Sequence, residues 1–168
     1  MNKSIEEICN RQVERELYSS LLYLAMASWT ETQGYNGVSD WLYEQAEEEK
    51  EHALKFVRYI NERGGKAILP ALKQPPPKYK DIPTLFDQVF EHEQYITASI
   101  NEIVELSIKE KDFTTHNWIQ WFVSEQMEEE SSVQTIIDKL KLVGDHNMYI
   151  FDRDILSMRA GGESPAVE

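Results

Sequence analysis

The fold is decided by residues 38–63, which read VSDWLYEQAEEEKEHALKFVRYINER. Apolar residues recur in this stretch every three or four positions, which predicts one long amphipathic helix that stops at Gly64. Residues seven or eleven apart lie within about 20° of one another around a helix. Glu49 therefore shares a face with Leu42 and Phe56, so that a carboxylate stands in the middle of an apolar stripe.

Three other stretches repeat this periodicity and predict helices over residues 4–32, 82–111 and 113–143. Ser4 and Glu7 have the spacing of a capping box at the start of the first of them. Asp81 is expected to cap the helix that begins at residue 82, with Pro83 in its first turn. A last stretch, residues 148–159, is predicted to form a short fifth helix.

The lengths of the connections predict the topology. Short breaks after residues 32 and 111 indicate antiparallel neighbours. The connection 64–81 carries Pro70 and the prolines at 75–77. Fully extended, it would reach about 55 Å, which exceeds the roughly 40 Å of such a helix. We therefore predict an all-α four-helix bundle with one long crossover and a short C-terminal fifth helix, in a single domain over residues 1–168.

Composition excludes several classes of partner. The net charge of −13 opposes binding to the phosphate backbone, so we expect no nucleic-acid partner. The most apolar run, residues 17–29, contains serines and is too short to span a membrane, so no membrane partner is expected. The single cysteine, Cys9, requires no oxidising compartment, and the N-terminus is too polar for a signal peptide. A cytoplasmic location is expected.

Each of the four long helices carries a glutamate near the middle of its apolar stripe. These glutamates are Glu16, Glu49, Glu93 and Glu129. Carboxylates that share a core need cations or protons, because an unpaired buried charge is very costly. A metal cluster is the economical explanation. The alternative is that the four residues lie at the edges of their stripes and face solvent.

Further ligand types sharpen the metal hypothesis. Glu49 and His52 form a Glu-x-x-His pair whose side chains meet on one helix face, an arrangement found in di-iron carboxylate bundles. Gln126 and Glu129 have the same spacing on the fourth helix. Carboxylates with one imidazole and no thiolate favour iron or manganese over structural zinc.

With these residues the sequence resembles the bacterial non-haem ferritins, from about residue 5 to residue 156. The matching segments are ELYSSLLY at 16–23, EEEKEH at 47–52, HEQ at 92–94 and VSEQMEEE at 123–130. They occur in the family's order and on four different helices. The resemblance implies a ferritin-like bundle with two adjacent iron sites in each subunit.

The resemblance also implies the ligands and catalytic residues of the diiron centre. Glu16, Glu49 and His52 would bind the first iron, with Glu49 bridging to the second. Glu93 and Glu129 would complete the second iron site.

Two further features follow from the same resemblance. Gln126 would lie close enough to the second iron to bind or hydrogen-bond there, and Tyr23 would assist electron transfer, although a core tyrosine with a satisfied hydroxyl is the alternative. A third iron site nearby would be formed by Glu48, Glu125, Glu128 and Glu129.

The function that the resemblance implies is iron storage with ferroxidase activity. Fe(II) would be oxidised by O2 or H2O2, and the product would be deposited as ferric oxyhydroxide in a homo-oligomeric cage of 24 subunits. The short last helix would gather at the fourfold axes or pack on its own bundle. No haem is expected, because Lys50 stands where bacterioferritins have a haem-ligating methionine. His92 is expected at the surface.

Two other functions remain open at the level of sequence. A diiron oxidase or peroxide-reducing enzyme of the rubrerythrin type would turn over without storing iron, and it usually has two Glu-x-x-His pairs, of which one is found. A non-catalytic helical interaction protein would bind no iron tightly. Retained iron and the effect of changing Glu49 would distinguish these possibilities.

Overall fold

The computed structural model describes residues 1–158 and contains seven helical elements. Four are long: α1 (Lys3–Thr32), α2 (Asn36–Glu62), α3 (Ile82–Lys109) and α4 (Phe113–Val143). Three short ones follow: the 3₁₀ turn η1 (Asp145–Asn147), α5 (Met148–Asp154) and the 3₁₀ turn η2 (Ile155–Met158). The predicted all-α fold is confirmed, and each end of a long helix lies within two residues of its predicted position.

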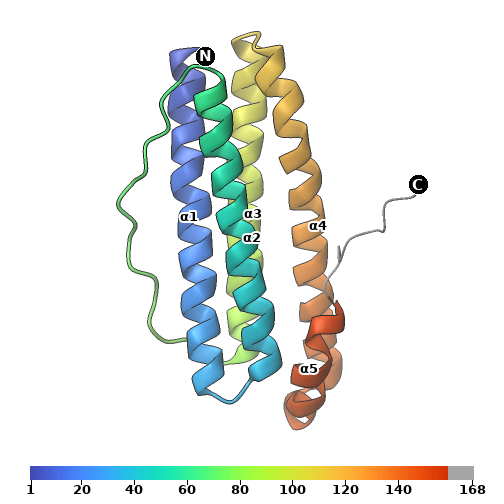
Figure 1. The fold of residues 1–168 in the computed structure, drawn as a ribbon. Helices are drawn as coiled ribbons and strands as arrows, with labels where there is room; N and C mark the ends of the chain where they lie inside the picture. The colour runs from blue at the N-terminus through green and yellow to red at the C-terminus, as the bar shows by residue number, and fades with distance from the viewer. Residues whose placement is uncertain (159–168) are drawn as a thin grey trace, which may run out of the picture.

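The long helices form an elongated bundle (Figure 1). α1 and α2 run antiparallel and pack together along their length, as do α3 and α4. The crossover between α2 and α3 follows the outside of the bundle from one end to the other, so that α2 and α3 run in the same direction. Within residues 1–158, no helix is long and apolar enough to cross a membrane.

The caps at two helix starts can be compared with the sequence prediction. Asp81 caps α3 as predicted, accepting a hydrogen bond from the Thr84 amide at 2.8 Å. At α1 the prediction was wrong, because Asn2 rather than Ser4 is the N-cap. Asn2 has the extended backbone that an N-cap requires, and its Oδ1 accepts from the amide of Ser4 at 2.9 Å.

The chain after α4 packs on its own bundle. The buried side chains of Phe151 and Ile155 join the core of α1–α4, and Asp152 Oδ1 accepts from the Val38 amide at 2.9 Å. A Cβ on Gly37 would lie 1.8 Å from the Asp152 carbonyl oxygen, so this approach requires glycine. The predicted single helix over 148–159 changes to 3₁₀ geometry after Asp154, and residue 159 lies outside the described residues.

The buried apolar side chains form two clusters, one toward each end of the bundle. The first contains the residues around Met26, Leu42 and Phe86, and the second those around Val13, Phe56 and Ile100. Along each long helix, the residues between the two clusters include buried polar side chains. The bundle therefore has a polar layer enclosed by apolar layers above and below.

Candidate metal centre

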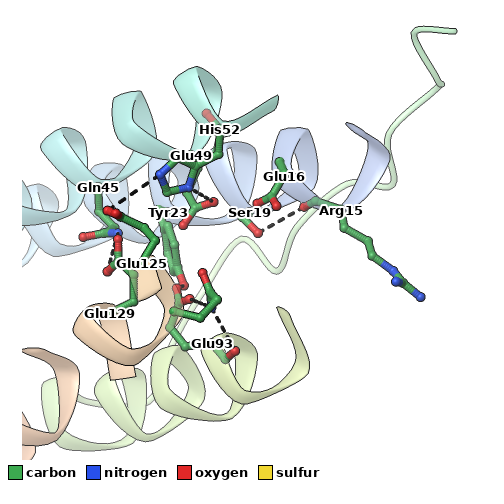
Figure 2. A network of polar contacts seen from close by, with 12 residues as sticks. Arg15, Glu16, Ser19, Tyr23, Gln45, Glu49, His52, Glu93, Glu125 and Glu129 are labelled. Atoms are coloured by element: carbon green, nitrogen blue, oxygen red, sulfur yellow. Dashed lines mark hydrogen bonds and ion pairs between the residues drawn. The ribbon is translucent and has the colours of Figure 1, made fainter. Parts of the chain in front are cut away.

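The polar layer brings together the four glutamates found in the apolar stripes. Figure 2 shows their carboxylates, and the imidazole of His52, pointing toward one another from all four long helices. All five residues are buried. Their residues have exposed fractions of 1% for Glu16, 1% for Glu49, 2% for His52, 0% for Glu93 and 7% for Glu129.

Three of these residues form what we call the inner group: Glu16, Glu49 and His52. One ligand atom from each lies within 4.8 Å of the others. His52 Nδ1 is 3.6 Å from Glu49 Oε2. Glu16 Oε2 and both carboxylate oxygens of Glu49 are buried and have no hydrogen-bond partner. Such oxygens are very costly unless a cation or proton occupies the space between them.

The second half of the layer is hydrogen-bonded within itself. Tyr23, which is fully buried, donates its hydroxyl proton to Glu93 Oε1. Gln126 Nε2 donates to Glu93 Oε2 at 3.1 Å. Glu93 and Glu129 both interact electrostatically with Glu49. The second set of predicted ligands thus faces the same carboxylate as the inner group, although no ligand group within residues 1–158 includes Glu93 or Glu129.

Burial raises the pKa of every carboxyl in the layer. For Glu49 the charges of Glu93 and Glu129 add to this effect, and the pKa lies well above its ordinary value. The pKa values of Glu16 and Glu129 are also raised well above the ordinary value, first by burial and then by neighbouring carboxylates. The pKa of Glu93 is raised by burial, although the bonds from Tyr23 and Gln126 oppose the rise. Binding of cations must therefore compete with protons.

Two buried glutamines that sequence reasoning missed hold two of the predicted ligands in place. Gln12 Nε2 donates to Glu16 Oε1 at 2.8 Å, while Gln12 Oε1 accepts from the Ser99 hydroxyl at 2.8 Å. Gln45 Nε2 lies 2.9 Å from both carboxylate oxygens of Glu129. Each glutamine stands four residues before a mid-stripe glutamate, on the same face. A polar residue four positions before a mid-stripe glutamate could therefore have indicated, from the sequence alone, a side chain in the same buried layer.

A second set of possible ligands, the outer group, consists of Glu48, His52 and Glu125. Their ligand atoms also lie within 4.8 Å of one another, and His52 Nε2 is 4.0 Å from Glu125 Oε1. Glu48 and Glu125 are partly exposed. Glu128 and Glu129 were also predicted to share this third site, but no ligand group within residues 1–158 includes either of them, and Glu128 is exposed.

The prediction of a surface position for His92 was wrong. Its ring is partly buried, and its Nε2 lies 2.7 Å from the Ser19 hydroxyl. The rings of Tyr18, Tyr23 and Tyr95 surround it. Burial lowers the pKa of His92 to about 4. The small Ser19 side chain on α1 leaves the space for this ring, which the sequence of α3 alone does not reveal.

The bundle and its polar layer define a class of protein: four-helix bundles whose buried carboxylate and histidine side chains can hold metal ions. Comparison with known proteins specifies the family. Residues 6–143 match the model of the ferritin-like domain named Ferritin. The bacterial non-heme ferritin of Campylobacter jejuni is 40% identical over 157 residues, covering 92% of this chain and 94% of the relative.

Other relatives agree. A probable bacterial non-heme ferritin-like protein of Haemophilus influenzae is 36% identical over 92% of this chain and 95% of its own length. The open pore ferritin of the archaeon Archaeoglobus fulgidus superposes with a TM-score of 0.90 and is 39% identical, covering 92% of this chain and 96% of that one. This chain belongs to the ferritin family, and that membership supports a role in iron storage.

Proposed function

We propose that this protein is an iron-storage ferritin with ferroxidase activity. Two Fe(II) ions are its substrates in each subunit. Glu16, Glu49 and His52 bind the first, Glu49 bridges to the second, and Glu93 and Glu129 complete the second site. Gln126 holds Glu93 by a hydrogen bond. The oxidised iron is deposited as ferric oxyhydroxide inside a cage of 24 copies in the cytoplasm.

One observation carries this proposal: both oxygens of the buried Glu49 carboxylate lack a hydrogen-bond partner. A carboxylate kept only for packing would be replaced without loss by an apolar residue. Glu49 is central, because it lies 3.6 Å from His52 and is affected electrostatically by Glu93 and Glu129. A bridge between two cations gives each of its free oxygens a partner.

The charges of the site balance for two Fe(II) ions. The four carboxylates bring four negative charges, and two Fe(II) ions bring four positive ones. When each iron loses an electron, two positive charges remain uncompensated. Hard anionic oxygens favour the higher oxidation state, and oxide or hydroxide from water restores neutrality. The partly exposed Glu48 and Glu125 offer the iron a route out of the layer.

The redox step is balanced by an external oxidant. Two Fe(II) ions and O2 give two Fe(III) ions and H2O2 with uptake of two protons. With H2O2 as the oxidant, the O–O bond breaks and two waters form. Because the pKa values of the site carboxyls are raised, binding of iron displaces protons, which become available for this reduction.

The test is the amount of soluble iron retained per chain after aerobic loading with excess Fe(II) and gel filtration. Storage predicts far more iron than the ligands of one subunit can hold, in a particle whose mass by sedimentation corresponds to 24 chains. Retention of only two or three ions per chain would support a diiron enzyme without storage. No retained iron would contradict the proposal.

A matched pair of variants tests the assignment of the site. Glu49→Ala should abolish rapid oxidation. Glu47→Gln removes a carboxylate from the same helix that is exposed and paired with Lys50. The rate in this control should stay that of the wild type. Equal rates in both variants would show that the polar layer is not the site of oxidation.

A further inference from the structure

One arrangement beside the polar layer has no part in iron binding. His92 lies at the centre of three tyrosines, with ring centroids 5.9 Å from Tyr23, 6.1 Å from Tyr18 and 6.0 Å from Tyr95. Tyr23 contacts the site through its hydrogen bond to Glu93. Tyr95 is 51% exposed. A continuous series of redox-active and aromatic rings therefore leads from the buried site to the surface.

The outer end of this series opens into a cleft. The cleft has a volume of about 380 Å³ and lies between α1, α3 and the crossover. Tyr18 and Tyr95 line it. Its charged lining residues are Arg11, Arg15, Lys73 and one carboxylate, Glu14. Arg15 is already paired with Glu102 at 3.4 Å. Arg11 and Lys73 still leave an excess of positive charge over Glu14, which is a local exception on a chain of net charge −13 and suits a small anion.

We propose that His92 relays single electrons to Tyr23 from Tyr18 and Tyr95, the two tyrosines that line the cleft. The donor is a small anionic one-electron reductant bound in the cleft. The relay is needed when H2O2 meets a subunit that holds one Fe(II) ion instead of two. Reduction of H2O2 to water requires two electrons, and a single Fe(II) supplies only one. This inference rests on the proposed function.

The step balances in atoms and electrons. As the O–O bond breaks, Fe(II) gives one electron and becomes Fe(III), and the Tyr23 phenol gives the second electron together with its proton. The oxygens leave as one hydroxide and one water, and Tyr23 remains as a phenoxyl radical. Glu93, which accepts the Tyr23 hydrogen bond, lies on the route of the proton.

The radical is then reduced through the relay. One of the cleft tyrosines, Tyr18 or Tyr95, gives one electron to Tyr23 by way of the His92 ring and releases its own proton to water. Tyr23 takes one proton back by way of Glu93, and the reductant gives one electron to the oxidised cleft tyrosine, which regains its proton from water. The oxidising equivalent ends on a dispensable small molecule, whereas without the relay it would remain in the core.

The experiment uses the assembled protein loaded with one Fe(II) per chain without oxygen and mixed with one equivalent of H2O2. Electron paramagnetic resonance measures the tyrosyl radical, and ascorbate is the reductant. The double variant Tyr18→Phe/Tyr95→Phe should form the radical but lose it to ascorbate about tenfold more slowly, the change that ~1.4 kcal/mol in barrier produces. Tyr23→Phe should form no early radical.

Two controls make the result specific. Tyr149→Phe removes a tyrosine that is 79% exposed on α5 and should leave formation and decay unchanged. Arg11→Gln/Lys73→Gln should slow decay with anionic ascorbate but not with neutral hydroquinone, because only the anion benefits from the cations.

The rate of Fe(II) oxidation by O2 at two ions per chain is read in the same samples. That rate should be equal in the wild type and in Tyr18→Phe/Tyr95→Phe. If the double variant oxidises Fe(II) at the normal rate and its radical also decays at the wild-type rate, the relay is overturned but the proposed function is not. An absence of oxidation in the wild type would overturn the proposed function, and the relay with it.

Discussion

The inner and outer groups share His52 but differ in their access to water. Glu16 and Glu49 are buried, and three of their four carboxylate oxygens lack a hydrogen-bond partner. In the outer group, the Glu125 side chain is 20% exposed and Glu48 is partly exposed. Water can hydrate the outer carboxylates when no cation is present, but it does not serve the inner ones in this way. The inner group therefore requires cations or protons, whereas the outer group does not depend on them.

The largest expected effect comes from removing the ligand at the centre of the inner group. Glu49→Ala should slow the initial oxidation of Fe(II) by about 100-fold or more, because both irons lose their shared ligand and with it their relative position. Stopped-flow absorbance with two Fe(II) per chain measures this rate. The distinction between an essential inner group and a dispensable outer group would be wrong if the double variant Glu48→Gln/Glu125→Gln lost as much activity as Glu49→Ala.

The second prediction concerns stability and its dependence on pH. The folded-state pKa values of Glu16, Glu49 and Glu129 are raised, so the folded protein binds more protons than the unfolded chain above the ordinary pKa of glutamate. The metal-free protein should therefore lose stability as the pH rises from there through the raised pKa values. A bound cation removes this penalty, so the increase in Tm on adding redox-inert Zn²⁺ should be larger at about pH 7.5 than at about pH 5.

The same measurement sharpens the comparison when Glu49→Gln is added. This variant replaces a buried carboxyl by an uncharged amide, and the metal-free protein should gain about 1–3 kcal/mol at neutral pH. Its response to Zn²⁺ should shrink, while that of Glu47→Gln should match the wild type. A loss of stability in metal-free Glu49→Gln would show that the inner carboxylate stabilises the fold by itself.

The sequence allowed the bundle and the burial of its four central glutamates to be predicted because both follow from helical periodicity. A glutamate seven residues from Leu42 and from Phe56 lies on the same face whatever the other helices do. The crossover was predictable for a similar reason, since its length can be compared with that of a helix. Partners on other helices were not predictable. The burial of His92 depends on Ser19 of α1, and the role of Gln12 depends on Ser99 of α3.

Replacing Gln12 should have an intermediate effect, because Gln12 positions a proposed ligand, Glu16, and is not itself one of the proposed ligands. Its amide is fixed by Ser99, so its Nε2 donates to Glu16 Oε1 while Glu16 Oε2 stays free for a cation. Gln12→Leu should weaken binding of the first metal ion about tenfold, measured by titration with Zn²⁺. Ser99→Ala should weaken it less, because the amide can still reach Glu16. Equal affinity in Gln12→Leu and the wild type would show that burial alone orients Glu16.

The smallest effect is expected in the outer group. In Glu48→Gln/Glu125→Gln the rate at which the first two Fe(II) ions are oxidised should change by at most about fivefold. This factor corresponds to the ~1 kcal/mol that an exposed charge pair contributes. His52 keeps its place in this variant, because the rings of Trp121 and Phe122 pack against it. Later additions of Fe(II) should slow more than the first, because the proposed route takes oxidised iron out of the layer past these two carboxylates. Successive additions of Fe(II) in one stopped-flow series separate the rate of the first oxidation from the rates of the later ones. If the later rates fall no more in the double variant than in the wild type, the outer group has no part in moving iron.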